Sequence, residues 1–177
     1  MLFKISLPVL AAIFFTACNH NGNEQPIGSK APEQASIPAP AKGLQIKDDK
    51  LHALFQQYEQ LTAALVKGDM TAAKIAANAI QVGAEQVNNG HGVADAARKI
   101  TTAADVDAQR NSFVALSKDM ITLVKQSGLK SGVLYVDFCP MAQQDKGAHW
   151  LTRNKAIENP YFGEQMLTCG SVQETLQ

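Results

Sequence analysis

A stretch early in the chain, LHALFQQYEQLTAAL at residues 51–65, decides the fold. Its large apolar and aromatic side chains recur at steps of three and four residues, at Leu51, Leu54, Tyr58, Leu61 and Leu65. That step is the period of a helix with one buried face. Gly68 and Asp69 follow, and these residue types favour the end of one helix and the N-cap of the next. The stretch therefore predicts two helices joined by a turn at Gly68 and Asp69.

The helical period continues through residue 123. Residues 88–90, Asn-Asn-Gly, separate the second helix from a shorter one at 93–103, and Asp105 and Gly128 suit the two ends of a fourth helix. The inward positions are Ala73, Ala76, Ala77, Ile80, Ala84 and Val87, then Ala94, Ala97 and Ile100, then Val106, Phe113, Leu116, Met120 and Leu123. The pattern predicts a mainly α domain over residues 44–177, built on an antiparallel bundle of three long helices and one short helix.

The last part of this domain has a different pattern. Residues 133–138, Val-Leu-Tyr-Val-Asp-Phe, are rich in β-branched and aromatic side chains and favour a strand, and residues 172–176 suit a second one. A lone strand leaves its backbone groups unpaired, so we expect the two strands to pair as an antiparallel ribbon. The segment between them, rich in Gly, Pro and Asn, is predicted to be mostly loop.

That ribbon makes a prediction about the two cysteines of the domain. Cys139 ends the first strand and Cys169 precedes the second, so antiparallel pairing brings both to one end of the ribbon. Two cysteines in an oxidising compartment commonly form a disulfide, and closing a loop of this length stabilises a fold by about 3–4 kcal/mol. A disulfide between Cys139 and Cys169 is therefore one interpretation.

A soft-metal site is the other interpretation. Thiolate and thioether ligands together select Cu(I), and Cys139, Met141, Met166 and Cys169 offer four such donors, with His149 as a fifth. Zinc is less well served, because no Cys-x-x-Cys pair is present. Composition and spacing leave both interpretations open, and one does not exclude the other, since reduction would free the thiols.

The N-terminus carries an export pattern. Lys4 precedes an apolar run at residues 5–15, and Thr16-Ala17-Cys18 resembles the lipobox of bacterial lipoproteins. We predict a lipoprotein signal peptide at residues 1–17 and a lipid on Cys18. Asn19 is not the Asp of the inner-membrane retention signal, which favours an outer-membrane anchor facing the periplasm. Residues 18–43 hold four prolines and few large apolar side chains, so we predict a disordered tether.

Four short motifs resemble a known family. They are FCPMA at 138–142, GAHWL at 147–151, IENPYFG at 157–163 and MLTCG at 166–170, with RNSF at 110–113 in the preceding helix. They are similar to an uncharacterised exported bacterial domain that also occurs fused to periplasmic adaptor subunits of copper, silver and heavy-metal efflux pumps. The resemblance implies a role near metal handling, with a heavy-metal efflux system as partner, and it raises copper binding to equal standing with the plain disulfide.

Charge and motif content exclude other classes. Lys plus Arg and Asp plus Glu both number 16, so the basic face of a nucleic-acid binder is not expected. An enzyme using Cys139 as nucleophile and His149 as base lacks an orienting acid or oxyanion motif, so we expect no enzyme. The prediction is a lipid-anchored periplasmic protein that binds a soft ion such as Cu(I). The alternative is a disulfide-stapled interaction module of the cell envelope without a metal.

Overall fold

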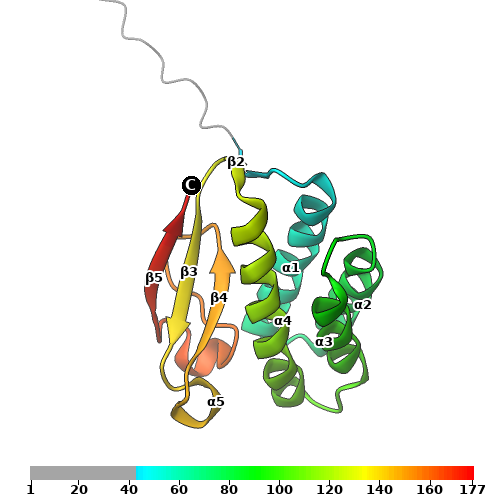
Figure 1. Cartoon of the computed structure of the whole chain (residues 1–177). Helices are drawn as coiled ribbons and strands as arrows, with labels where there is room; N and C mark the ends of the chain where they lie inside the picture. Colours follow the sequence, from blue (N-terminus) through cyan, green and yellow to red (C-terminus); the bar gives the residue numbers. More distant parts are fainter. Residues whose placement is uncertain (1–42) are drawn as a thin grey trace, which may run out of the picture. The chain divides into compact units, whose positions relative to one another are not determined.

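The computed structural model describes residues 43–177 (Figure 1). The predicted signal peptide, the predicted lipidation site Cys18 and nearly all of the predicted tether lie outside the described residues. The elements, in chain order, are β1 (Gln45–Ile46), α1 (Asp49–Lys67), α2 (Met70–Ala84), α3 (His91–Thr102), α4 (Val106–Ser127), β2 (Leu129–Ser131), β3 (Leu134–Cys139), α5 (Ala142–Asp145), β4 (Ala148–Thr152), the 3₁₀ helix η1 (Gly163–Met166) and β5 (Ser171–Leu176). No helix within residues 43–177 has the length and apolar character that spanning a membrane requires.

The helix ends are set by local capping chemistry, as predicted. The carboxylate of Asp69 accepts a hydrogen bond from the backbone N–H of Ala72 at 2.9 Å, and that of Asp105 accepts one from Ala108 at 2.7 Å. Each bond satisfies a backbone donor that the first helical turn leaves unpaired. Gly68 ends α1 with φ of 69°, a left-handed conformation that a glycine adopts without steric penalty. The turn between α1 and α2 is confirmed.

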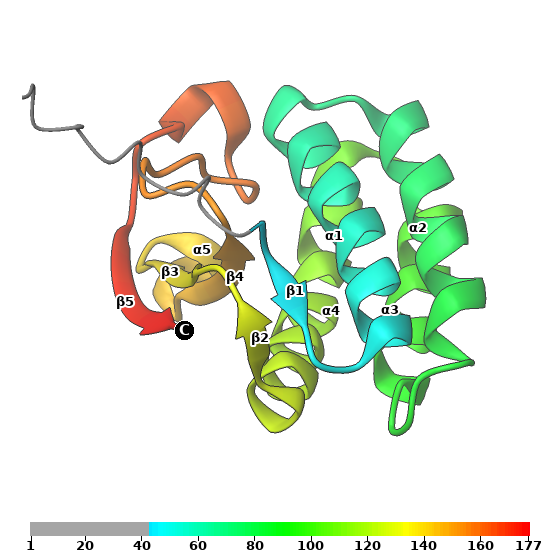
Figure 2. The ribbon, with the colours of Figure 1, turned by 90° about the horizontal axis from the view of Figure 1, so that it is seen from above.

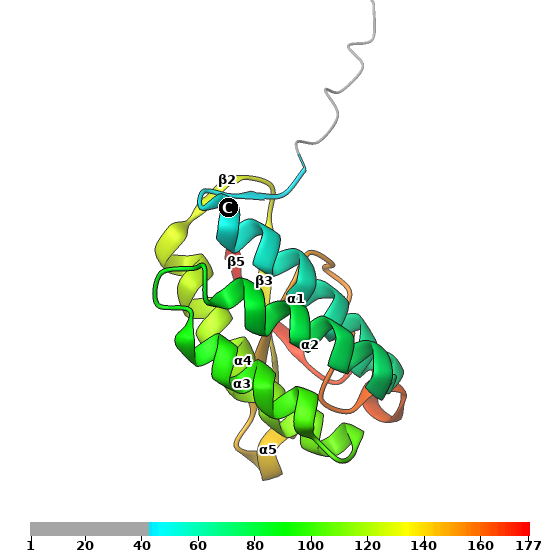
Figure 3. The same cartoon turned by 90° about the vertical axis from the view of Figure 1, so that its right-hand side faces the viewer.

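The four long elements α1 to α4 pack as the predicted bundle, three longer helices with a shorter α3 (Figure 3). Each helix lies against the next one in the chain, and α4 also packs on α1. The inner faces of α2 and α3 are mostly alanine, which permits close approach of the helices. A row of stacked aromatic rings runs through the core from Phe55 to Tyr58 to Phe113, with centroid separations of 5.7 and 5.4 Å.

The C-terminal strands form a three-stranded antiparallel sheet in the order β4-β3-β5. The predicted pairing of β3 with β5 is confirmed, but the expected ribbon of two strands was incomplete, because β4 pairs along the other edge of β3. Also unpredicted is a small sheet in which β1 pairs with β2 at the two ends of the bundle sequence. Both additions join segments that are distant in sequence, which a local pattern does not reveal.

The sheet lies on one side of α1 and α4, while α2 and α3 lie on the other (Figure 2). The junction contains a buried polar contact. The hydroxyl of Tyr58 in α1 accepts a hydrogen bond from the backbone N–H of Leu151 in β4 at 3.0 Å and lies 2.7 Å from the hydroxyl of Ser117 in α4. One side chain thus ties both central helices to the sheet.

Candidate functional site

The structure brings the two cysteines of the domain together. Their Sγ atoms lie 3.5 Å apart, one at the end of β3 and the other two residues before β5. Cys139 is buried, and Cys169 is partly exposed. The pair is therefore reachable from one side only, through Cys169. The hydrogen bond with Cys139, together with burial, raises the pKa of the Cys169 thiol.

A buried asparagine holds the loop that carries Cys169. The Asn159 side chain donates to the carbonyl of Cys169 at 2.9 Å and accepts from the backbone N–H of Tyr161 at 2.8 Å. Its backbone N–H donates to the carbonyl of Leu167 at 2.8 Å. Because Asn159 is fully buried, these bonds fix the position of the loop, and with it the second sulfur.

His149 does not join the thiols. It lies in β4 opposite Phe138, one residue before Cys139 on β3, and successive residues of a strand point to opposite faces. Its ring packs on that of Phe138 with centroids 4.5 Å apart, and it faces a groove along α4. Burial, and secondarily the charge of Lys125, lower the pKa of its imidazole. The sheet register therefore separates this predicted ligand from the sulfur pair.

The two methionines lie on the segment between the cysteines. Met166 ends η1, and its carbonyl accepts a hydrogen bond from the backbone N–H of Cys169 at 3.1 Å, so its backbone adjoins the thiol-bearing turn. The side chain of Met141 is 46% exposed and lines a neighbouring cavity. Neither methionine is fully buried, since Met166 is half-buried and Met141 is exposed.

The charged members of the donor set are few. Within residues 43–177, His, Cys, Asp and Glu side chains form no group of three or more that could hold a metal ion. A structural zinc ion takes four ligands of these types. What the site offers is two adjacent thiols with thioethers on the same segment, which is a donor set suited to a soft ion.

Asp137 also belongs to this region, although the sequence pattern did not predict it as a site residue. It lies two residues before Cys139 on β3, hence on the same face, and opposite Trp150 of β4. Its side chain is fully buried, and neither carboxylate oxygen has a hydrogen-bond partner among the described residues. Burial raises its pKa to about 6, because the charged form is poorly solvated there. An Asp inside an apolar strand run was the only sequence signal.

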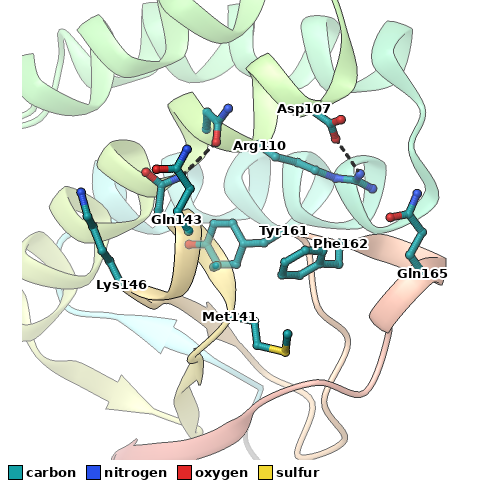
Figure 4. A pocket seen from close by; sticks show the side chains of 11 residues that line it. Asp107, Arg110, Met141, Gln143, Lys146, Tyr161, Phe162 and Gln165 are labelled. Carbon is teal, nitrogen blue, oxygen red and sulfur yellow. Dashed lines mark hydrogen bonds and ion pairs between the residues drawn. The ribbon is translucent and has the colours of Figure 1, made fainter.

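A cavity of about 570 Å³ lies beside the segment that follows Cys139 (Figure 4). Its walls come from the first turns of α4, from residues 141–146 and from residues 161–165. The wall at 143–145 has an unusual backbone, since Gln143, Gln144 and Asp145 have φ values of 56°, 56° and 63°. Three consecutive non-glycine residues in the left-handed conformation are strained, by about 1–2 kcal/mol each.

Comparison with known proteins covers the helical part. Residues 54–132 match the model of a family described as a protein of unknown function (DUF3347). The match is less than half of the 177-residue chain, runs from α1 to just past β2, and stops before both cysteines, the sheet and the cavity loops. No curated protein and no solved structure matches the chain.

Proposed function

We propose that this chain is a lipid-anchored protein of the cell envelope that binds a soft metal ion, Cu(I), at Cys139 and Cys169. The observation that supports the proposal is the 3.5 Å separation of the two Sγ atoms. With one sulfur buried and the other partly exposed, an ion can approach from the side of Cys169 and meet both. The proposal assigns the chain no catalytic role.

The chemistry of the donors favours a monovalent soft ion. Thiolates select Cu(I) over harder ions, and Cu(I) is stable with as few as two sulfur ligands, whereas zinc takes four. The thioethers of Met141 and Met166 would complete the coordination as further soft donors. Binding requires both thiols to lose their protons, so it releases up to two protons for each ion.

The location and partner rest on the sequence. A lipobox-like Thr16-Ala17-Cys18 supports export and lipidation, and Asn19 favours the outer membrane facing the periplasm. The motif resemblance supports a role in heavy-metal homeostasis or efflux, with an export system as the recipient of the ion. A lipid anchor and a soft-ion site together describe an envelope protein that captures an ion and passes it on.

The same short separation favours a second function. Two thiols at 3.5 Å need only a small approach to form a disulfide, whose sulfurs lie at about 2.05 Å. In an oxidising envelope the bond would close the loop between β3 and β5 and stabilise it by about 3–4 kcal/mol. The chain would then be a disulfide-stapled interaction module with no metal.

Thiol counting and Cu(I) titration separate the two functions. We would use the full chain carrying Cys18→Ala, purified in detergent, so that only Cys139 and Cys169 carry thiols. After reduction we expect one Cu(I) per chain in competition with a chromogenic Cu(I) chelator. Uptake is lost in Cys139→Ser and in Cys169→Ser, and it weakens in Met166→Leu.

His149→Ala is the matched control, because it removes a metal-binding residue type from the opposite face of the sheet and should leave uptake unchanged. If the reduced chain takes up no Cu(I), the metal proposal fails. The absence of free thiols before reduction, combined with that result, would establish the stapled module instead.

A further inference from the structure

The cavity in Figure 4 is separate from the thiols and has the properties of a binding site. Its volume of about 570 Å³ lies in the range of small-ligand sites. Most of its lining is polar, yet its floor is apolar. The floor includes Tyr161, Phe162 and the exposed side chain of Met141.

One wall carries a positive charge that is fixed in place. The guanidinium of Arg110 donates to the carbonyl of Pro160 at 3.2 Å and to the carbonyl of Leu65 at 3.0 Å, and its side chain is only 10% exposed. Its third bond goes to the carboxylate of Asp107 at 3.3 Å. A guanidinium has five N–H donors, so these three bonds leave two of them unused.

The carboxylate of Asp107, which already pairs with Arg110, would compete only weakly with a carboxylate on a ligand. The side chain of Asp107 is 82% exposed, and a water-exposed ion pair contributes little. A second cation, Lys146, lines the opposite wall and is exposed, and it has no ion-pair partner within residues 43–177. The cavity therefore has an excess of positive charge, which favours a carboxylate on the ligand.

The remaining polar groups are amides. Asn111, Gln143, Gln144 and Gln165 line the cavity, and each side chain offers both a donor and an acceptor. Gln143 donates to Asn111 at 3.0 Å, which ties the left-handed turn to α4. Strained backbone of this kind often occurs where a protein holds groups ready for a ligand. Side-chain amides match the N–H and C=O groups of a peptide backbone.

We infer that this cavity binds a short peptide segment that bears a carboxylate. The carboxylate lies between Arg110 and Lys146, the peptide backbone pairs with the amide side chains, and an apolar side chain rests on Phe162 and Met141. The site includes neither Cys139 nor Cys169 and needs no bound metal, although it shares Met141 with the proposed metal donors. It makes the domain a receptor for an acidic or carboxylate-terminated stretch of another protein.

Three peptide probes test the inference on the ¹⁵N-labelled full chain in detergent. N-acetyl-Ala-Glu-Ala-amide carries a side-chain carboxylate, Ala-Ala-Ala carries a terminal one, and N-acetyl-Ala-Gln-Ala-amide carries none. We expect at least one of the first two, at millimolar concentration, to shift the NMR signals of residues 141–146 and 161–165. The Gln peptide should bind more weakly, and whichever acid binds better identifies the source of the carboxylate.

Charge variants give a two-sided check. Lys146→Gln should weaken binding roughly twofold to fivefold, and Asp107→Asn should strengthen it by a similar factor, since it removes the competing carboxylate. Lys99→Gln, on an exposed position of α3, is the control and should change nothing. If neither acid binds more tightly than the Gln peptide, the inference is overturned, and Arg110 remains a structural tie between α1, α4 and the loop at Pro160.

Discussion

Replacing Asp137 by Asn should stabilise the protein at neutral pH. The carboxylate is fully buried, and neither oxygen has a hydrogen-bond partner among the described residues. Asn has nearly the same shape as the protonated acid and no charge. The substitution therefore removes the energy of holding an unpaired charge in the interior while leaving the packing against Trp150 in place.

The size and the pH range follow from the pKa. Burial raises the pKa of Asp137 from its ordinary value of 3.8 to about 6. Each pKa unit corresponds to 1.36 kcal/mol. The raised pKa therefore lowers the free energy of unfolding by about 3 kcal/mol once Asp137 is ionised in both the folded and the unfolded state. The folded protein holds the proton more tightly, so stability is greatest below about pH 4 and falls until about pH 6.

The assay is urea unfolding of the reduced, metal-free full chain in detergent, followed by circular dichroism at pH 4 and pH 7.5. We expect Asp137→Asn to gain about 2–3 kcal/mol at pH 7.5 and almost nothing at pH 4. Asp95→Asn, whose side chain is 64% exposed, is the matched control without such a pH dependence. A variant that is less stable than the parent at pH 7.5 would refute the reasoning, because it would mean that the charged carboxylate has a partner.

Two further changes test the packing around the site. Tyr58→Phe should lower the free energy of unfolding by about 1–3 kcal/mol, because the backbone N–H of Leu151 loses its acceptor and stays buried; Ser117→Ala, which spares that bond, should have a smaller effect in the same urea assay. Gly163→Ala should destabilise by several kcal/mol, because its added Cβ would lie 2.5 Å from both the Arg110 guanidinium and a backbone oxygen, whereas Gly68→Ala, with open space around it, should lose only about 1–2 kcal/mol from the left-handed conformation. Equal losses in the two glycine variants would show that the crowding is relieved by movement of the loop.

The helical part of the fold was predictable because its signals are local. The apolar period of residues 51–65, the caps Asp69 and Asp105, and the ending at Gly68 all act within one turn of chain, and each is confirmed. Strand β4 was not predicted, because its five residues form a strand through pairing with β3 rather than through a local pattern. The left-handed turn was not predicted, because two of its three residues are Gln, which rarely adopts that conformation.

The candidate site was half predictable for a related reason. Antiparallel pairing of β3 with β5 was sufficient to place Cys139 beside Cys169. His149 was grouped with them because β4 was not recognised, and only a strand's alternation reveals which face a side chain takes. The lack of a partner for Asp137 depends on every segment packed around it, so no stretch of sequence contains that information.

The two sulfurs flank the segment that forms most of the cavity wall, since residues 141–146 and 161–165 lie between Cys139 and Cys169. A disulfide or an ion that joins the two sulfurs closes this segment into a loop. A peptide bound in the cavity contacts the same loop. Thermodynamic linkage is reciprocal. A peptide that raises the affinity of the protein for the ion is itself bound more tightly, by the same factor, when the ion is present. If both proposals hold, a peptide in the cavity and an ion at the thiols would each change the affinity of the protein for the other.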